Sequence, residues 1–238
     1  MDWRENTAVV ILGMHRSGTS WLTGALQQAG LHLGRHHTWN PYNQKGNREN
    51  PDLFELHEEI LARSGFAWDS PPPLDGESLW TQGFLSRAER LCAEIGQRSP
   101  WGFKDPRTLL LLDGWLQLLS NVRMVGIFRH PLAVAASLES RNLMARDRAL
   151  ELWLAYNLRL IDAHERFGPF PLLSFDWERD RLHEALFQSC RTLGLDDSPH
   201  RQDFYAEDLK HNRVVSGHLP AEVEAAYIRL KAWSEGSL

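Results

Sequence analysis

The sequence predicts an α/β fold in which helices flank a central parallel sheet. Short apolar runs, typical of buried strands, alternate along the chain with longer segments whose apolar residues recur at helical spacing. Strands separated by helices pair in parallel through right-handed crossovers. Because the chain has 238 residues, 42% of them hydrophobic, we expect a single domain over residues 1–238 that buries its own core.

The first half of the chain is expected to hold two strands and three helices. Asn50 and Pro51 are typical of a helix N-cap and first position, and Gly30 is typical of a helix end. The expected ranges are a strand at 8–13, helices at 19–29, 51–63 and 84–95, and a strand at 101–103.

The second half continues the alternation. A helix is expected at 106–119, where Leu109–Leu112 followed by Asp113 imitates a Walker-B strand but comes directly after Pro106 and fits a buried helix better. The remaining ranges are strands at 123–128 and 171–175, helices at 132–142, 147–167 and 181–193, and a helical, peripheral tail at 200–238.

Composition limits the classes of function. A net charge of −5 argues against a nucleic-acid surface, so any anion site must be a local cluster of cations. No signal peptide or membrane-spanning run is apparent, and the two cysteines, Cys92 and Cys190, show no metal spacing. We therefore expect a cytoplasmic protein with free thiols and no membrane span.

The segment from Gly13 to Ser20, GMHRSGTS, carries the strongest functional signal. It follows an apolar run and precedes a helix, so its backbone N–H groups and the helix dipole favour a bound phosphate or similar anion. It keeps the two glycines of GxxxxGK[ST], but Thr19 replaces the lysine and a cation appears at Arg16. This pattern differs from that of a magnesium-dependent kinase.

A second cluster of cations and hydroxyls follows the strand expected at 123–128. Arg129 stands at the strand end, and Ser137 and Arg141 share a face of the next helix because they are four residues apart. Ligands of such sheets bind beyond the carboxyl ends of the strands. Both clusters should therefore meet at one edge of the sheet, where a second phosphate can bind the two arginines.

These two motifs resemble those of sulfotransferases that use 3′-phosphoadenylyl sulfate (PAPS). The loop is similar to their 5′-phosphosulfate loop, [KR]-S-G-T-[ST]-x-[LM], over Arg16, Ser17, Gly18, Thr19, Ser20 and Leu22, and Trp21 matches a tryptophan that stacks on adenine in several members. The spacing of Arg129 and Ser137 matches the family's 3′-phosphate motif, and Arg141 recurs in its protein-tyrosine branch. The resemblance implies a P-loop NTPase-like three-layer sandwich, PAPS as co-substrate, 3′-phosphoadenosine 5′-phosphate (PAP) as product and no metal.

The resemblance also implies which residues act at the sulfuryl group. Lys104, in Lys104-Asp105-Pro106, matches the family's sulfuryl-contacting lysine, and Arg16 supplies a second cation. Asp105 has two interpretations, an ordinary N-cap before Pro106 or a catalytic base.

The base that accepts the proton of the acceptor stays open among several residues. Glu49 is the nearest counterpart of the glutamate used in the protein-tyrosine branch, and the histidines of the long loop at 30–50 are alternatives, as is Asp105. These histidines are His32, His36 and His37, whose consecutive pair lacks a third metal ligand. His57 falls among apolar residues of a helix and fits a core histidine.

The acceptor is expected to be a small molecule, carbohydrate or lipid with a hydroxyl or amine. Aromatic residues in loops, Trp39, Tyr42, Trp68 and Trp80, suggest an aromatic entrance. Cations of the tail, Lys210, His211 and Arg213, are candidates for extra 3′-phosphate contacts or for a solvated helix end. The rival functions are a P-loop kinase or other NTPase, and a non-catalytic nucleotide- or carbohydrate-binding module.

Overall fold

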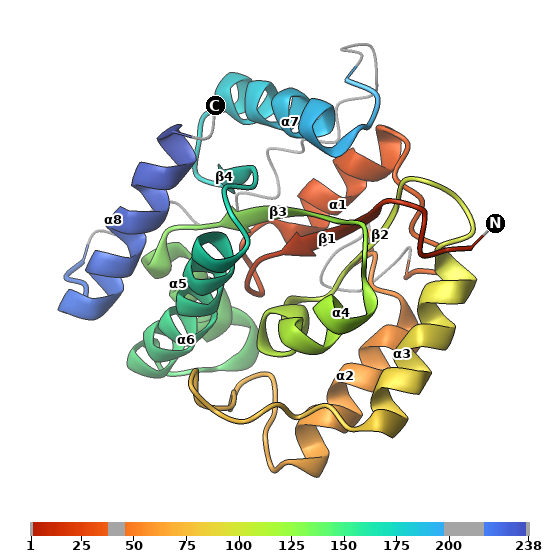
Figure 1. The fold of residues 1–238 in the computed structure, drawn as a ribbon. Coiled ribbons are helices and arrows are strands. Elements are labelled where there is room, and N and C mark those ends of the chain that lie inside the picture. The colour runs from red at the N-terminus through yellow and green to blue at the C-terminus, as the bar shows by residue number, and fades with distance from the viewer. Residues whose placement is uncertain (1, 38–45, 198–216, 237–238) are drawn as a thin grey trace.

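The protein is built around one parallel sheet. The computed structural model describes residues 2–37, 46–197 and 217–236. Its strands are β1 (Ala8–Leu12), β2 (Trp101–Lys104), β3 (Val122–Phe128) and β4 (Leu172–Ser174). They lie in the order β2-β1-β3-β4, and every neighbouring pair is parallel (Figure 1). The predicted α/β fold with a central parallel sheet is confirmed.

Helices cover both faces of this sheet and make three layers. On one face lie α1 (Thr19–Gln28) and α7 (Arg179–Leu193), which Figure 1 shows above the strands. The helices packed on the opposite side are α2 (Pro51–Arg63), α3 (Gln82–Ile95), α4 (Leu112–Leu118), α5 (Pro131–Asn142), α6 (Arg146–Arg166) and α8 (Ala221–Gly236), with the 3₁₀-helix η1 (Pro106–Leu110).

The side chains of β1 alternate between two hydrophobic cores. Val9 and Ile11 pack with α1 and α7, whereas Val10 and Leu12 pack with the larger helical layer. Because successive strand residues point to opposite faces, a strand covered on both sides reads as a continuous apolar run. This is why residues 8–12 are all buried.

The strand register brings the carboxyl ends together at one edge. Ile11 pairs with Lys104 of β2, and Leu12 pairs with Gly126 of β3. The loop after β1, Asp105 after β2 and Arg129 after β3 therefore leave the sheet side by side. The sequence motifs meet at this edge, as predicted.

Helix bounds follow local signals, with one correction. The side chain of Asn50 accepts hydrogen bonds from the backbone N–H groups of Asp52 and Leu53, which confirms the predicted N-cap of α2. The single helix predicted over 106–119 is wrong, because η1 and α4 are separated at Leu111. The carbonyl of Leu111 instead accepts a hydrogen bond from Trp80 Nε1 at 3.0 Å. The Walker-B-like run is not a strand, as predicted: Leu109 and Leu110 lie in η1, and Leu112 begins α4.

The sequence suggested that the C-terminal helix is peripheral, but part of α8 packs into the core. Val223, Ala226 and Leu230 of α8 are buried against the core formed with α6. The tail cations Lys210, His211 and Arg213 lie outside the described residues.

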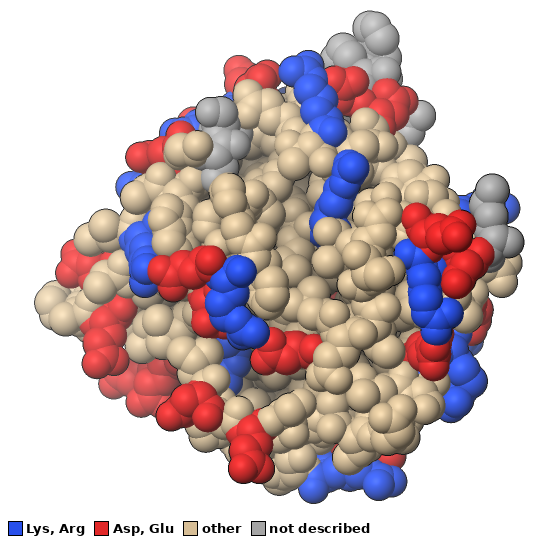
Figure 2. Space-filling model, viewed as in Figure 1, with Lys and Arg blue, Asp and Glu red and all other residues tan. Residues whose placement is uncertain are grey.

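Charge is mixed over the surface in view. Figure 2 shows acidic and basic side chains interspersed on this face, with wide neutral areas between them. Cys92 and Cys190 are both free and buried. In the part of the chain that the structure describes, no helix combines the length and the apolar character needed to span a bilayer.

Candidate functional site

The loop between β1 and α1 has the backbone of an anion cradle. Arg16 (φ 66°) and Gly18 (φ 89°) both adopt left-handed conformations. Gly18, the N-cap residue of α1, has no side chain to cap the helix, so the first N–H groups of α1 can bind a ligand. Ser17 adds a buried hydroxyl that has no hydrogen-bond partner among the described residues.

Gly18 is required both by its backbone conformation and by its neighbour. A Cβ atom at Gly18 would lie 2.4 Å from the Phe175 ring, whereas Gly30, also left-handed (φ 103°), has nothing within 4 Å. We expect Gly30→Ala to cost about 1 kcal/mol from backbone strain alone. Gly18→Ala should cost about 1–3 kcal/mol more, because the ring must move. Urea unfolding of both variants measures the difference, and equal losses would contradict the packing argument.

The two anion motifs touch through Arg16. Its Nε donates a hydrogen bond to Ser137 Oγ on α5 at 2.8 Å. Burial lowers the pKa of Arg16, and the nearby guanidiniums of Arg141 and Arg129 lower it further. Three like charges close together favour an anion between them, which relieves their mutual repulsion. Residues 121 apart in the sequence thus form one positive site.

Arg129 lies at the end of β3, where the chain turns into α5. It is 6% exposed and its guanidinium lies 5.5 Å from the centre of the Phe175 ring. Its Nε is 3.7 Å from Asp176 Oδ1, and its carbonyl accepts a hydrogen bond from Trp153 Nε1 at 3.0 Å. Its position at the end of β3 and these neighbours keep the Arg129 side chain close to Arg16, within the positive site.

Trp21, predicted to stack on adenine, lies in α1 and packs against Phe175. The two ring centres are 6.0 Å apart, and Trp21 is 3% exposed. Its Nε1 is buried without a hydrogen-bond partner in the described part of the chain. Thr19 is buried, and the Ser20 hydroxyl lies 3.4 Å from the carbonyl of Asn47.

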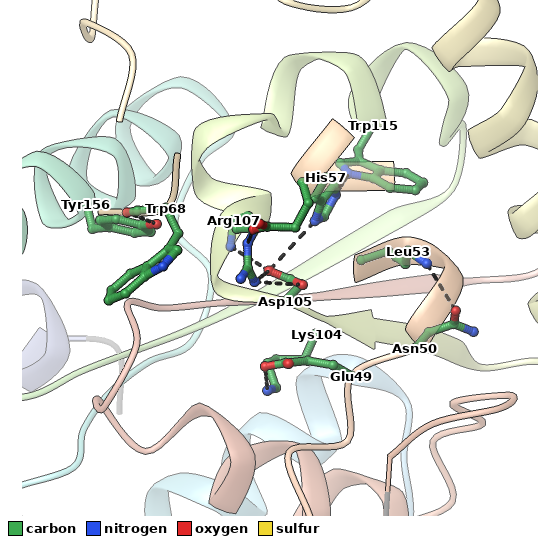
Figure 3. A network of polar contacts seen from close by, with 11 residues as sticks. Glu49, Asn50, Leu53, His57, Trp68, Lys104, Asp105, Arg107, Trp115 and Tyr156 are labelled. Atoms are coloured by element: carbon green, nitrogen blue, oxygen red, sulfur yellow. Dashed lines mark hydrogen bonds and ion pairs between the residues drawn. The ribbon is translucent and has the colours of Figure 1, made fainter. Parts of the chain in front are cut away.

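Lys104 and Glu49 form a buried ion pair beside the loop. Lys104 Nζ lies 2.7 Å from Glu49 Oε1, and the two side chains are 1% and 11% exposed (Figure 3). Lys104 comes from the end of β2, whereas Glu49 comes from the segment just before α2. The structure therefore brings these two predicted catalytic residues into direct contact.

Asp105 belongs to a buried network with Arg107 and His57. Its Oδ1 accepts hydrogen bonds from Arg107 N at 2.8 Å and from Arg107 Nη1 at 3.0 Å. Burial raises the pKa of Asp105, but Arg107 and His57 outweigh this and hold it below its usual range. The N-cap interpretation is confirmed, and the contacts of the Asp105 carboxylate with Arg107 and His57 disfavour it as the base.

His57 is buried, as the sequence suggested, and has polar partners. Its Nε2 accepts a hydrogen bond from Trp115 Nε1 at 2.8 Å, so the proton of the neutral ring is on Nδ1. That Nδ1 lies 3.7 Å from Asp105 Oδ1, and Figure 3 marks this contact with a dashed line. His57 thus links α2 to Asp105, the residue that follows Lys104 at the end of β2.

A cavity of about 310 Å³ opens beside the loop and the ion pair. Its charged lining includes Arg16, Glu49 and Arg141, and its apolar walls include Phe54, Trp68 and Leu138. The remaining residues around it are His15, Asn47, Arg107 and Asn142. A small molecule bound in this cavity would contact both Arg16 and Glu49.

The loop histidines are not gathered at this cavity. The backbone of His32 pairs with Trp101, at the start of β2 and the far end of the sheet. His36 Nε2 lies 3.3 Å from Gln27 Nε2, near the end of α1. His37 exchanges backbone hydrogen bonds with Arg48 and Glu49, so only its main chain is placed beside the site. The structure therefore places His32 and His36 away from the cavity, which disfavours them as the base.

The aromatic entrance is only partly as predicted. Trp68 lines the cavity, but Trp80 packs on Trp115 with ring centres 5.5 Å apart and lines a different cavity, between α4 and the segment that precedes α3. Trp39 and Tyr42 lie outside the described residues. The sequence reasoning missed His15, which lines the cavity. The available signal was its place in the loop, after Met14, which is buried, and directly before Arg16.

Metal ligation has no support in residues 2–37, 46–197 and 217–236. No group of three or more His, Cys, Asp and Glu side chains in these ranges is arranged to hold an ion.

Comparison with known proteins identifies the fold. No protein-family model matches the chain, and no curated protein matches it. The sulfotransferase domain of the olefin synthase from Synechococcus PCC 7002 superposes with a TM-score of 0.55 at 19% identity, over 95% of this chain and 94% of that one. The sulfotransferase domain of the curacin biosynthetic pathway gives 0.57 at 14% identity, over 95% and 98%. The chain has the fold of sulfotransferase domains.

Proposed function

We propose that the protein, as a single domain over residues 1–238, is a sulfotransferase that moves the sulfuryl group of PAPS to a hydroxyl or amine. The observation that carries this proposal is the 2.8 Å contact between Arg16 and Ser137, because it joins the two anion motifs into one site. A donor with phosphate groups at both ends of an adenosine fits such a pair of motifs. The fold shared with sulfotransferase domains supports the same conclusion.

The donor site is proposed to hold two anionic groups. The backbone N–H groups around Ser17, Gly18, Thr19 and Ser20, at the uncapped start of α1, would bind the 5′-phosphosulfate. Arg129, Ser137 and Arg141 would bind the 3′-phosphate, and Trp21 would contact the adenine. Charge-assisted hydrogen bonds of this kind are stronger than neutral ones and fix the donor in place.

The transfer is an in-line displacement at sulfur. The acceptor oxygen forms a bond to sulfur as the bond between sulfur and the bridging phosphate oxygen breaks. Arg16 and Lys104 stabilise the negative charge that builds on the sulfuryl and bridging oxygens. Arg16 keeps its charge throughout, because a guanidinium does not deprotonate in proteins. Glu49 accepts the acceptor's proton once the sulfuryl group competes for Lys104.

Arg129→Ala should separate binding from chemistry. Because Arg129 acts far from the reacting bond, we expect its loss to raise the KM for PAPS about tenfold or more, with a smaller fall in kcat. Steady-state kinetics against PAPS concentration measure both constants. Arg123→Ala, which removes an exposed arginine at the start of the same strand, is the matched control. A fall in kcat with an unchanged KM would contradict this assignment.

Transfer of ³⁵S from labelled PAPS to a panel of small-molecule, carbohydrate and lipid acceptors tests the function. Labelled product that depends on the protein and is lost in Lys104→Met is the expected result. A non-catalytic module would bind PAP without transfer. A kinase or NTPase would bind ATP–Mg²⁺ more tightly than PAP in calorimetry.

A further inference from the structure

His15 stands beside the reacting centre with no role in the mechanism above. It lines the same cavity as Arg16 and Glu49. Its ring is held between Trp68, at 4.8 Å between ring centres, and Tyr156, at 5.8 Å. The Tyr156 hydroxyl in turn donates a 2.8 Å hydrogen bond to the Trp68 carbonyl, which ties these two walls together (Figure 3). These two rings flank the imidazole at the cavity wall.

The imidazole has an unused polar atom. Its Nε2 is buried and has no hydrogen-bond partner among the residues that the structure describes. Buried polar atoms of folded proteins are nearly always paired, and an orphan of this kind calls for an explanation. A ligand in the cavity, with a small turn of the ring, provides one.

The surroundings of His15 are rich in cations. Charged and titratable groups face it from every element packed around it: Arg16 in the loop, Glu49 before α2, Lys104 and Asp105 at the end of β2, Arg107 in η1, Arg141 on α5 and Tyr156 on α6. Burial and Arg107 lower the pKa of His15 well below its usual value, with Lys104 and Arg141 adding to this and Asp105 opposing it. These surroundings favour the neutral imidazole over the imidazolium.

We propose that His15 binds the sulfuryl end of the donor and takes up a proton from solvent as the donor binds. This inference rests on the proposed function. After burial and Arg107, the cations that lower the pKa of His15 are Lys104 and Arg141, and the donor's negative groups would neutralise these cations. Once those charges are compensated, an imidazolium is favoured, and it donates a hydrogen bond to a sulfuryl oxygen beside Arg16 and Lys104. No covalent bond changes in this step.

Protonation and donor binding must then strengthen each other. The pKa of His15 is higher in the complex than in the free protein, so the extra affinity is fully present below the free-protein pKa. It is lost as the pH rises through the pKa of the complex. Each pH unit between these two values changes the affinity by at most about tenfold.

The test is calorimetry with adenosine 5′-phosphosulfate, whose anionic groups do not titrate near neutrality. Binding is measured from pH 5.5 to 8.5 in buffers of different ionisation enthalpy, for the wild type, for His15→Gln and for His32→Gln, whose histidine lies at the far end of the sheet. We expect the wild type and His32→Gln to take up protons. Their affinity should fall from low to high pH at least about threefold more than that of His15→Gln.

A direct readout guards against a folding defect in His15→Gln. The ¹³C-labelled histidines of the wild type are titrated by NMR with and without the nucleotide, and the His15 signal is expected to shift to a higher pKa in the complex. Nucleotide binding with the same proton uptake in all three proteins and an unmoved His15 titration would overturn the inference alone. If neither adenosine 5′-phosphosulfate nor PAPS binds, the proposed function itself fails.

Discussion

Arg16→Ala should lower kcat by about 10²–10³-fold, the loss seen when one group that stabilises developing charge is removed from an active site. Arg16 belongs to the first motif, and its Nε lies 2.8 Å from Ser137 Oγ of the second. Its KM for PAPS should change less, because the backbone N–H groups and Arg129 still bind the two ends. Initial rates at saturating PAPS measure the effect.

Arg16→Lys is the matched control for that experiment. It keeps a positive charge but loses the planar guanidinium, so we expect it to retain at least about a tenth of the activity. The left-handed conformation at φ 66° is similarly unfavourable for arginine, alanine and lysine. The backbone strain is therefore about the same in the wild type, Arg16→Ala and Arg16→Lys. An Arg16→Ala enzyme with normal kcat and a raised KM would show that Arg16 only binds the donor.

Asp105→Asn should cause the largest loss of stability. Asparagine keeps the N-cap but removes the buried charge that pairs with Arg107 at 3.0 Å. Breaking one partner of a buried ion pair typically costs about 3–5 kcal/mol. Urea unfolding at pH 7 measures the free energy. Asp113→Asn, which removes an exposed partner of Arg166, should cost about 1 kcal/mol or less.

The Asp105–Arg107 pair also makes the stability of the protein depend on pH. Because the pKa of Asp105 is lowered in the folded protein, its contribution is present above the unfolded-state pKa, near 4, and is lost as the pH falls below it. We expect Asp105→Asn to flatten that part of the acid unfolding curve. An Asp105→Asn protein as stable as Asp113→Asn would contradict the network.

The sequence predicted the parts of the fold that local signals determine. The apolar run of β1, the Asn50–Pro51 start of α2 and the arginine at the end of β3 all lie where the pattern placed them. The parallel sheet then made the meeting of Arg16 and Ser137 predictable, since both motifs follow strands at one edge.

Tertiary contacts decided the rest, and no local pattern contains them. The helix expected over 106–119 breaks at Leu111 because Trp80, from another segment, bonds to its carbonyl. Glu49 and Lys104 are 55 residues apart, so their pairing needs the whole fold. His15 was overlooked for the same reason, since the rings and charges that surround it come from several different elements.

We propose that the two joined anion sites bind both phosphates of one adenosine nucleotide. Calorimetric titration of the wild type with PAP and with AMP, which lacks the 3′-phosphate, tests it most directly. We predict that PAP binds at least about tenfold more tightly, a difference of about 1.4 kcal/mol, and that Arg129→Ala removes this preference. Equal affinity for PAP and AMP in the wild type would contradict the account.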